Sequence, residues 1–177
     1  MCDLRTGRGE ETAVSKIELL MNKAEITVDI NPTVEASLRK AEETGMPAVA
    51  IELPDGRVIT GKTSSLLGAS SAALLNALKE LAGLDDSLHL IAPEVIEPIQ
   101  HLKVEHLGNH NPRLHTDETL IALSISAVTD LNAEQAMEHL AELSGCDAHS
   151  TVILSQVDTD VFRKLGVNMS CEPRYQT

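Results

Sequence analysis

Four neighbouring residues, Lys62, Thr63, Ser64 and Ser65, form the grouping most suited to binding an anion. Residues 56–63 also satisfy the phosphate-loop pattern G-x-x-x-x-G-K-[ST]. A phosphate loop must curl its N–H groups around phosphate, whereas the intervening Arg-Val-Ile-Thr is typical of a strand. We therefore predict no nucleotide-hydrolysing loop here. A weaker anion site is still open, because the four residues precede a predicted helix whose first N–H groups attract negative charge; the alternative is a helix cap beside a solvated lysine.

A second polar cluster lies in the loop before the helix predicted for 117–129. Its members are Asn109, Asn111, Arg113, His115, Thr116 and Asp117. Loops on a rigid scaffold are a common place for binding residues. In this interpretation the guanidinium group of Arg113 donates paired hydrogen bonds to an anion, and His115 and Asp117 are candidate catalytic residues. The alternative is a polar loop that only caps the helix and satisfies its own backbone.

The same loop is rich in histidine, which raises the question of a metal site. His106 and His110 are four residues apart, but the segment lacks the glutamate of the zinc-protease motif. Gly108 and Pro112 also interrupt the helix that such a motif requires. We predict no metal site and assign no cofactor.

A third candidate is the pair His149 and Ser150, at the start of a predicted strand. Adjacent residues on a strand point to opposite faces, so the two cannot act as base and nucleophile for each other. Ser150 could still contact a ligand and His149 could exchange a proton with it. The alternative is a purely structural strand.

The composition excludes several classes of partner. Acidic side chains number 27 against 14 basic ones, and the net charge of −13 opposes binding to nucleic acid or to an anionic membrane. Aromatic residues make up 1% of the chain, too few for a base-stacking platform. Three cysteines without C-x-x-C spacing, no long apolar run and no signal-peptide pattern favour the reduced cytoplasm. A small anion is the partner class that remains.

The elements that must position these residues follow from hydrophobic periodicity and turn signals. The predicted helices cover 10–24, 32–45, 64–82, 93–102 with a kink or break at Pro98, 117–129, 132–144 with a capping box at Asn132 and Gln135, and 158–165 capped by Asp158. The predicted strands cover 48–53, 57–60, 88–91, 149–154 and 167–171. Because the 117–129 helix is apolar nearly all round, we expect it to be central.

These elements predict an α/β fold with a mixed sheet of about five short strands and flanking helices. A hairpin turning at Asp55-Gly56 and a carboxy-terminal βαβ unit form the sheet. We divide the chain into a helical segment, 1–45, and an α/β domain, 46–177. The small residues from Gly68 to Ala73 permit close packing on another element, which leaves open a structural domain that assembles into a homo-oligomer.

Several long segments closely resemble the bacterial family called domain of unknown function 1846. They are residues 2–22, 60–70, 111–118, 148–155, 162–168 and 171–173. Members of that family are considerably longer, so the resemblance implies a carboxy-terminal region that adjoins a large upstream region with a phosphate-loop-like segment. Some members carry the label ATP-dependent peptidase, for which these residues provide no mechanism.

The hairpin and the long helix after it also resemble the opening of the cytidine-deaminase-like fold. The position of that fold's zinc motif reads Ser70-Ser-Ala-Ala here, and the paired cysteines are absent. Zinc deaminase chemistry is therefore not expected, and the similarity is one of architecture only. The sequence as a whole predicts a domain that binds a small anionic or phosphorylated metabolite, or completes an active site, with structural assembly as the alternative.

Overall fold

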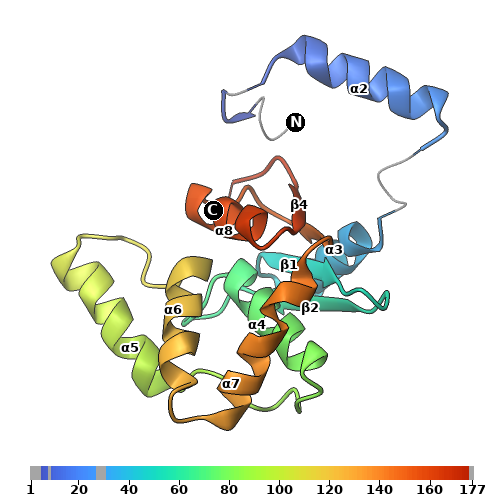
Figure 1. Ribbon diagram of the computed structural model, residues 1–177. Helices are drawn as coiled ribbons and strands as arrows, with labels where there is room; N and C mark the ends of the chain where they lie inside the picture. Colours follow the sequence, from blue (N-terminus) through green and yellow to red (C-terminus); the bar gives the residue numbers. More distant parts are fainter. Residues whose placement is uncertain (1–4, 8, 27–30, 176–177) are drawn as a thin grey trace.

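The computed structural model describes residues 5–7, 9–26 and 31–175. Its centre is a four-stranded sheet with the strand order β2-β1-β3-β4 (Figure 1). The strands are β1 (Ala48–Glu52), β2 (Val58–Lys62), β3 (Asp147–Ser150) and β4 (Asn168–Cys171). β1 is antiparallel to both β2 and β3, whereas β3 and β4 are parallel. The predicted mixed α/β fold, with its hairpin and βαβ unit, is confirmed.

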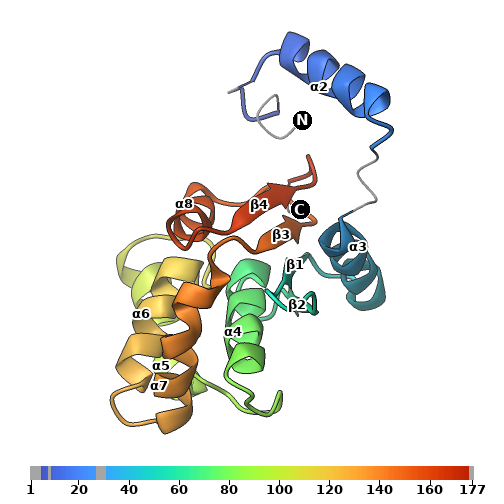
Figure 2. The ribbon, with the colours of Figure 1, turned by 45° about the vertical axis from the view of Figure 1, so that its right-hand side comes forward.

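Helices pack on both faces of the sheet, with α3 on one side and α4 on the other (Figure 2). The helices are α2 (Glu11–Lys23), α3 (Pro32–Thr44), α4 (Ala69–Leu81), α5 (Pro93–His101), α6 (Thr116–Ser126), α7 (Leu131–Glu138) and α8 (Gln156–Lys164). A π-helix, η2 (Leu102–His106), continues α5, and a 3₁₀ helix, η3 (His139–Leu143), continues α7. α6 and α7 contact α4 on the side away from the sheet, and α8 contacts α6 and β4.

The hydrophobic core lies between the sheet and α4. Val49 and Ile51 of β1 pack there with Leu74 and Leu78, and all four side chains are fully buried. Alternate residues of a strand point to opposite faces, so the small Ala50 faces the side that α3 covers. Burial on both faces explains why β1 reads as a continuous apolar run.

α4 crosses β2 at very close range. A Cβ atom built on Gly61 would lie 2.1 Å from the backbone nitrogen of Ala73. The small residues of α4 are therefore used inside the chain, where Ser71 and Ala73 are fully buried. The stretch from Gly68 to Ala73 is not available as a surface for a partner subunit, and that basis for the predicted oligomer is wrong.

The strand predicted for 88–91 is absent, so the sheet has four strands and not five. Leu90 and Ile91 are buried, but they lie in an irregular segment without strand pairing. A four-residue apolar run indicates burial and cannot by itself distinguish a strand from a buried loop. α5 also passes through Pro98 without ending there.

The long helix predicted from residue 64 begins five residues later, at Ala69. The Ser64 hydroxyl accepts hydrogen bonds from the N–H groups of Leu66 and Leu67, at 3.2 and 3.0 Å, and forms a turn in place of the first helical turn. Lys62 to Ser65 therefore do not form the amino terminus of α4. Gly68 occupies the N-cap position of α4, and no side chain caps this end of the helix.

Three predictions about the later helices are also corrected. α6 is not buried all round, because one of its faces is exposed. α7 is capped by Asp130 and not by the predicted box at Asn132. α8 begins at Gln156 and is capped by Ser155, which releases Asp158 for other contacts.

Candidate functional site

A cavity of about 210 Å³ opens where the loop before α6 meets the amino terminus of α4. It brings together four residues that the sequence proposed from two separate clusters: Thr63, Asn111, Arg113 and His115. The other lining residues are Pro47, Gly68, Ala69, Ser70, Leu114, Val152, Ile153, Leu154, Ser155 and Asp158. The lining thus combines hydroxyl groups, one guanidinium group, one imidazole and one carboxylate.

Backbone contacts hold the two polar segments side by side. The N–H of Leu114 donates to the carbonyl of Leu66 at 3.0 Å, and the N–H of Gly68 donates to the carbonyl of Leu114 at 3.2 Å. The Arg113 Nε atom donates to the carbonyl of Ser64 at 2.7 Å. These bonds fix Arg113 beside the start of α4, and its two terminal nitrogens have no hydrogen-bond partner among the described residues.

Two hydroxyl groups, on residues that are themselves largely buried, line the cavity with their hydrogen-bonding capacity unused. Thr63 is 3% exposed and Ser70 is 4% exposed, yet neither hydroxyl makes a hydrogen bond within the part of the chain that the structure describes. The neighbouring Ser71, by contrast, donates to the Leu114 carbonyl at 2.9 Å. The described residues with a fully buried side-chain atom that lacks a partner are Thr119 and His149, so the hydroxyls of Thr63 and Ser70 are reached from the cavity and can hydrogen-bond to a ligand there.

The amino terminus of α4 adds unpaired backbone donors to this lining. The N–H groups of the first residues of a helix have no acceptor within the helix, and the helix dipole places partial positive charge there. No side chain caps the amino terminus of α4, and its residues Gly68, Ala69 and Ser70 line the cavity. This end of the cavity therefore favours an acceptor that carries negative charge.

His115 and Asp158 form an ion pair at the other end of the cavity. The Nδ1 atom of His115 lies 3.1 Å from Oδ2 of Asp158. The hydrogen bond to Asp158 raises the pKa of His115 above its ordinary value, although desolvation acts in the opposite direction. The pairing favours the charged form of His115, which makes this residue a candidate proton donor.

The Asp158 carboxylate is fully engaged by the protein. Oδ1 accepts from both the N–H and the hydroxyl of Thr116 at 3.0 Å, and Oδ2 accepts from the Ser155 hydroxyl at 2.7 Å as well as from His115. Burial alone would raise the pKa of Asp158, but these hydrogen bonds outweigh it and lower the pKa. Asp158 thus balances the charge of His115 and has little capacity left for a ligand.

Ser155, His115 and Asp158 do not form a nucleophilic triad. The Ser155 hydroxyl lies 3.4 Å from Nδ1 of His115, the same ring nitrogen that contacts Asp158. A triad needs the serine on one ring nitrogen and the carboxylate on the other. Ser155 instead caps α8 and supports Asp158.

A buried lysine fixes the loop that carries His115. Lys103, in the π-helix η2, is 3% exposed, and its Nζ atom donates to the Arg113 carbonyl at 2.7 Å and to Oε2 of Glu118 at 2.6 Å. The same Glu118 oxygen accepts from the His115 N–H at 2.9 Å. Lys103 and Glu118 therefore position both Arg113 and His115.

The structure places the remaining predicted residues away from the cavity lining. Lys62 and Ser65 are exposed on the far side of Thr63, and Asn109 is exposed in the loop. Ser64 contributes its carbonyl to Arg113 but does not line the cavity itself. Asp117 accepts from the N–H of Glu118 at 2.8 Å. Thr116 reaches the site only through Asp158.

His149 and Ser150 are buried within the sheet. The Nδ1 atom of His149 lies 2.8 Å from the Ser170 hydroxyl, and its Nε2 atom lies 3.4 Å from Glu172 Oε1 without hydrogen-bond geometry. Desolvation lowers the pKa of His149, although Glu172 opposes this. The Ser150 hydroxyl donates to the Val152 carbonyl at 2.8 Å. These contacts stabilise β3 and the residues that directly follow it.

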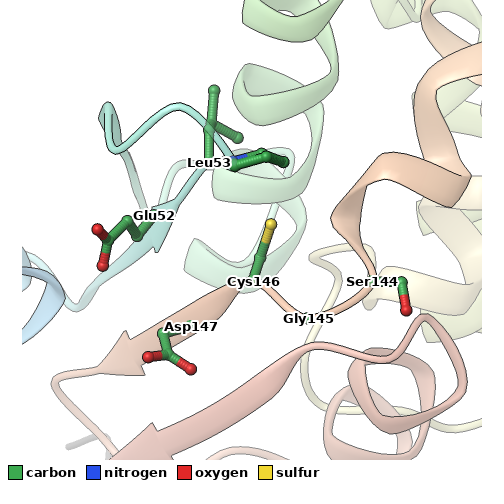
Figure 3. A pocket seen from close by; sticks show the side chains of 7 residues that line it. Glu52, Leu53, Ser144, Gly145, Cys146 and Asp147 are labelled. Carbon is green, nitrogen blue, oxygen red and sulfur yellow. The ribbon is translucent and has the colours of Figure 1, made fainter.

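A larger cavity of about 340 Å³ lies near the end of β1 and the start of β3 (Figure 3). Its charged groups are the carboxylates of Glu52 and Asp147, and no basic residue lines it. The Cys146 side chain points toward Leu53, whereas the Asp147 carboxylate points away from it (Figure 3). Burial, with Asp147 and Glu52 adding to it, raises the pKa of the Cys146 thiol, so this cavity lacks both an activated nucleophile and an anion site.

No group of three or more histidine, cysteine, aspartate or glutamate side chains in the described ranges is arranged to hold a metal ion. Within the same ranges, no helix is both long enough and apolar enough to cross a membrane.

The sequence reasoning missed four residues that shape the site: Ser70, Lys103, Ser155 and Asp158. Asp158 was interpreted as a helix cap, a role that the equally suitable Ser155 takes. Lys103 was not singled out, because a lone lysine in a polar segment is usually solvated. Only the placement of Ser70 two residues after Gly68, near the start of a helix, was a usable signal.

Comparison with known proteins gives a consistent family. The region described as domain of unknown function DUF1846, C-terminal, matches residues 29–177. A UPF0371 protein of Corynebacterium efficiens is 54% identical over 176 residues, which cover 99% of this chain and 36% of that protein. A UPF0371 protein of Streptococcus pyogenes serotype M5 is 52% identical with the same coverage.

The chain therefore spans only 36% of the length of the curated relatives that it matches. The match includes α3, the whole sheet and every residue of the cavity. On this evidence the chain belongs to the DUF1846 family and corresponds to its C-terminal domain.

Proposed function

We propose that this domain binds a small anionic metabolite, most favourably a phosphorylated one, in the cavity at the amino terminus of α4. In the longer protein it would act as a ligand-binding or active-site-completing domain. The observation that carries the proposal is the pair of hydroxyls on Thr63 and Ser70, two largely buried residues, which line the cavity without a partner among the described residues, beside an uncapped helix start.

The donors around the cavity are of the kinds that commonly bind a phosphate group. Ser70 and Thr63 offer hydroxyl donors, the first turn of α4 offers backbone N–H groups, and Arg113 offers the two terminal nitrogens of its guanidinium group. A phosphate has several oxygens, each of which can accept hydrogen bonds from these groups. The anion would contact Arg113 and α4 and not the exposed Lys62.

The charge of the site supports the same conclusion. The chain is strongly acidic, with a net charge of −13, so it would repel an anion in the absence of a local positive site. The one carboxylate in the lining, Asp158, is paired with His115 and hydrogen-bonded to Thr116 and Ser155. The cavity is thus a locally positive region on an acidic molecule.

His115 gives the site a chemical capability beyond binding. Its Nδ1 atom faces Asp158, and its Nε2 atom has no hydrogen-bond partner among the described residues. An imidazolium held in this way can donate a proton from Nε2 to an oxygen of a bound ligand. If the full-length protein is an enzyme, we expect His115 to be its general acid in this domain.

The test is thermal unfolding of the chain with inorganic phosphate, sugar phosphates and nucleotides. A ligand at about 100 times its Kd adds about 2.7 kcal/mol to the stability, which raises the Tm of a chain this size by about 5–10 °C. The proposal predicts such a shift for a phosphorylated ligand, and its loss in Thr63→Val, which removes only the hydroxyl.

Thr129→Val is the matched control, because Thr129 is exposed at the end of α6 and outside the cavity. A shift that survives in Thr63→Val and disappears in Lys62→Ala would move the anion to the strand end and contradict the proposal. The absence of any shift with every phosphorylated ligand would also contradict it.

A further inference from the structure

One face of α6 is apolar and exposed. Ile121, Ile125 and Val128 are 59%, 57% and 81% exposed. Ile121 and Ile125 are four residues apart and lie along one side of the helix, and Val128 follows in the turn after it. Leu131, at the start of α7, is 78% exposed. The opposite side of α6 carries Ala122 and Leu123, which are fully buried in the core.

Several properties distinguish this face from ordinary scattered surface residues. Single exposed leucines or isoleucines are normal, but a row of large apolar side chains on one helix marks an interaction surface. No charged side chain interrupts it, since residues 119–129 contain none. Helix formation would equally allow polar residues at these positions, so the composition indicates contact with another apolar surface.

We propose that the exposed face of α6 docks against the preceding region of the full-length protein. The chain makes up only 36% of the length of its relatives, and the family description places it at their carboxy-terminal end. The remaining majority of such a protein must be joined to this domain, and contacts between domains of one chain cover apolar patches of this kind.

The amino-terminal helix α2 has a second apolar face that the described residues leave exposed. It is amphipathic, yet none of its residues is buried, and Ile17 and Leu20 are 58% and 64% exposed. An amphipathic helix gains most of its stability from packing its apolar face. Two separate apolar faces, on α2 and on α6, are therefore uncovered within this chain.

A second copy of the chain fits the face less well. Two copies would each bring a net charge of −13 to the contact, and residues 119–129 contain no basic side chain that could offset the repulsion. The docking also requires no ligand, so it does not depend on the anion-binding proposal. It does place the preceding region close to the cavity, because His115 is the residue that begins α6.

The test is the rate of maleimide labelling of Ile125→Cys, read at that site by mass spectrometry. The full-length protein and the 177-residue chain are compared, with Glu138→Cys on α7 as the exposed control. We expect similar rates at both sites in the short chain. In the full-length protein the Ile125→Cys site should react about tenfold more slowly than the control, because a covered site reacts only after local opening.

Fast labelling of Ile125→Cys in the full-length protein would overturn the proposal, since the face would then be free. Slow labelling in the short chain that becomes fast on dilution would also overturn it, because a second copy would be the occupant. Hydrogen exchange of the α6 amides in the unsubstituted proteins gives the same comparison without a mutation. The proposal predicts slower exchange at Ile121 and Ile125 in the full-length protein.

Discussion

The Nδ1 atom of His115 lies 3.1 Å from Oδ2 of Asp158, although 43 positions separate the two residues in the chain. The contact joins the amino terminus of α6 to the first turn of α8. It stabilises the positive charge of His115 at one end of the cavity, while α4 and Arg113 provide donors at the other. The electrostatic character of the site therefore depends on this pair.

Asp158→Asn should lower the pKa of His115, because the charged partner that raises it is removed. NMR titration of the His115 ring protons measures the pKa directly. Asn keeps the size of the aspartate and one acceptor oxygen, so the two hydrogen bonds from Thr116 can remain while the charge that faces His115 is lost. An unchanged His115 pKa in the variant would show that the pair does not exist in solution.

The same pair gives stability a defined dependence on pH. His115 has a raised pKa in the folded state, so its contribution is complete below its ordinary value of 6.5 and is lost as pH rises through the folded pKa. Asp158 has a lowered pKa, so its contribution is present above 3.8 and is lost as pH falls through the folded pKa.

The difference in unfolding free energy between the wild type and Asp158→Asn should therefore be largest between about pH 4 and 6.5. This difference should shrink above the raised pKa of His115. The ring is neutral there, and the remaining partners of the Asp158 carboxylate are the uncharged donors of Thr116 and Ser155. Urea unfolding at a series of pH values measures this difference. A difference that grows steadily toward alkaline pH would have the wrong sign.

Lys103→Met should destabilise the chain by about 3 kcal/mol, the lower end for a broken buried ion pair, because Glu118 stays partly exposed to water. The substitution also leaves the Arg113 carbonyl without its lysine donor. Arg39→Met is the matched control, since Arg39 forms only an exposed pair with Glu35 at 3.7 Å. Removal of that pair should cost at most about 0.5 kcal/mol. Equal costs for the two variants would contradict the positioning role of Lys103.

Gly61→Ala tests the close crossing of β2 and α4. The added Cβ would lie 2.1 Å from the backbone of Ala73, so strand and helix must separate, at a cost of about 3 kcal/mol or more. Gly68→Ala is the control, because its nearest contact is an ordinary 3.6 Å from the Leu114 carbonyl. Its cost should be below about 1 kcal/mol. Thermal unfolding of both variants measures the contrast.

Local signals in the sequence were sufficient for much of the fold. α3 begins after Asn31 and ends at Gly45, where the backbone has the left-handed conformation that glycine adopts readily. The Asp55-Gly56 turn gives the β1–β2 hairpin, and the last parallel strand pair follows from its βαβ pattern. Each of these depends on residues that are neighbours in the chain.

The cavity could not be predicted in the same way, because distant contacts build it. The bonds between Leu114 and the segment around Gly68 join two loops that are separate in the sequence. Arg113 and His115 were proposed in one cluster and Thr63 in another, but the sequence does not contain the information that the two clusters share one cavity. The exposed face of α6 was missed for a related reason, since apolar composition predicts burial without saying against which part of the protein.

The most direct test of the central claim is a phosphate titration of the ¹⁵N-labelled chain followed by amide NMR. If the cavity is the anion site, the N–H signals of Ala69 and Ser70 should shift first and saturate together, and the Arg113 side-chain signals should shift with them. Arg113→Ala should weaken the binding about tenfold or more, as expected for a charge-assisted hydrogen-bond pair. Shifts confined to the exposed region around Lys62, or none at all in α4, would contradict the account.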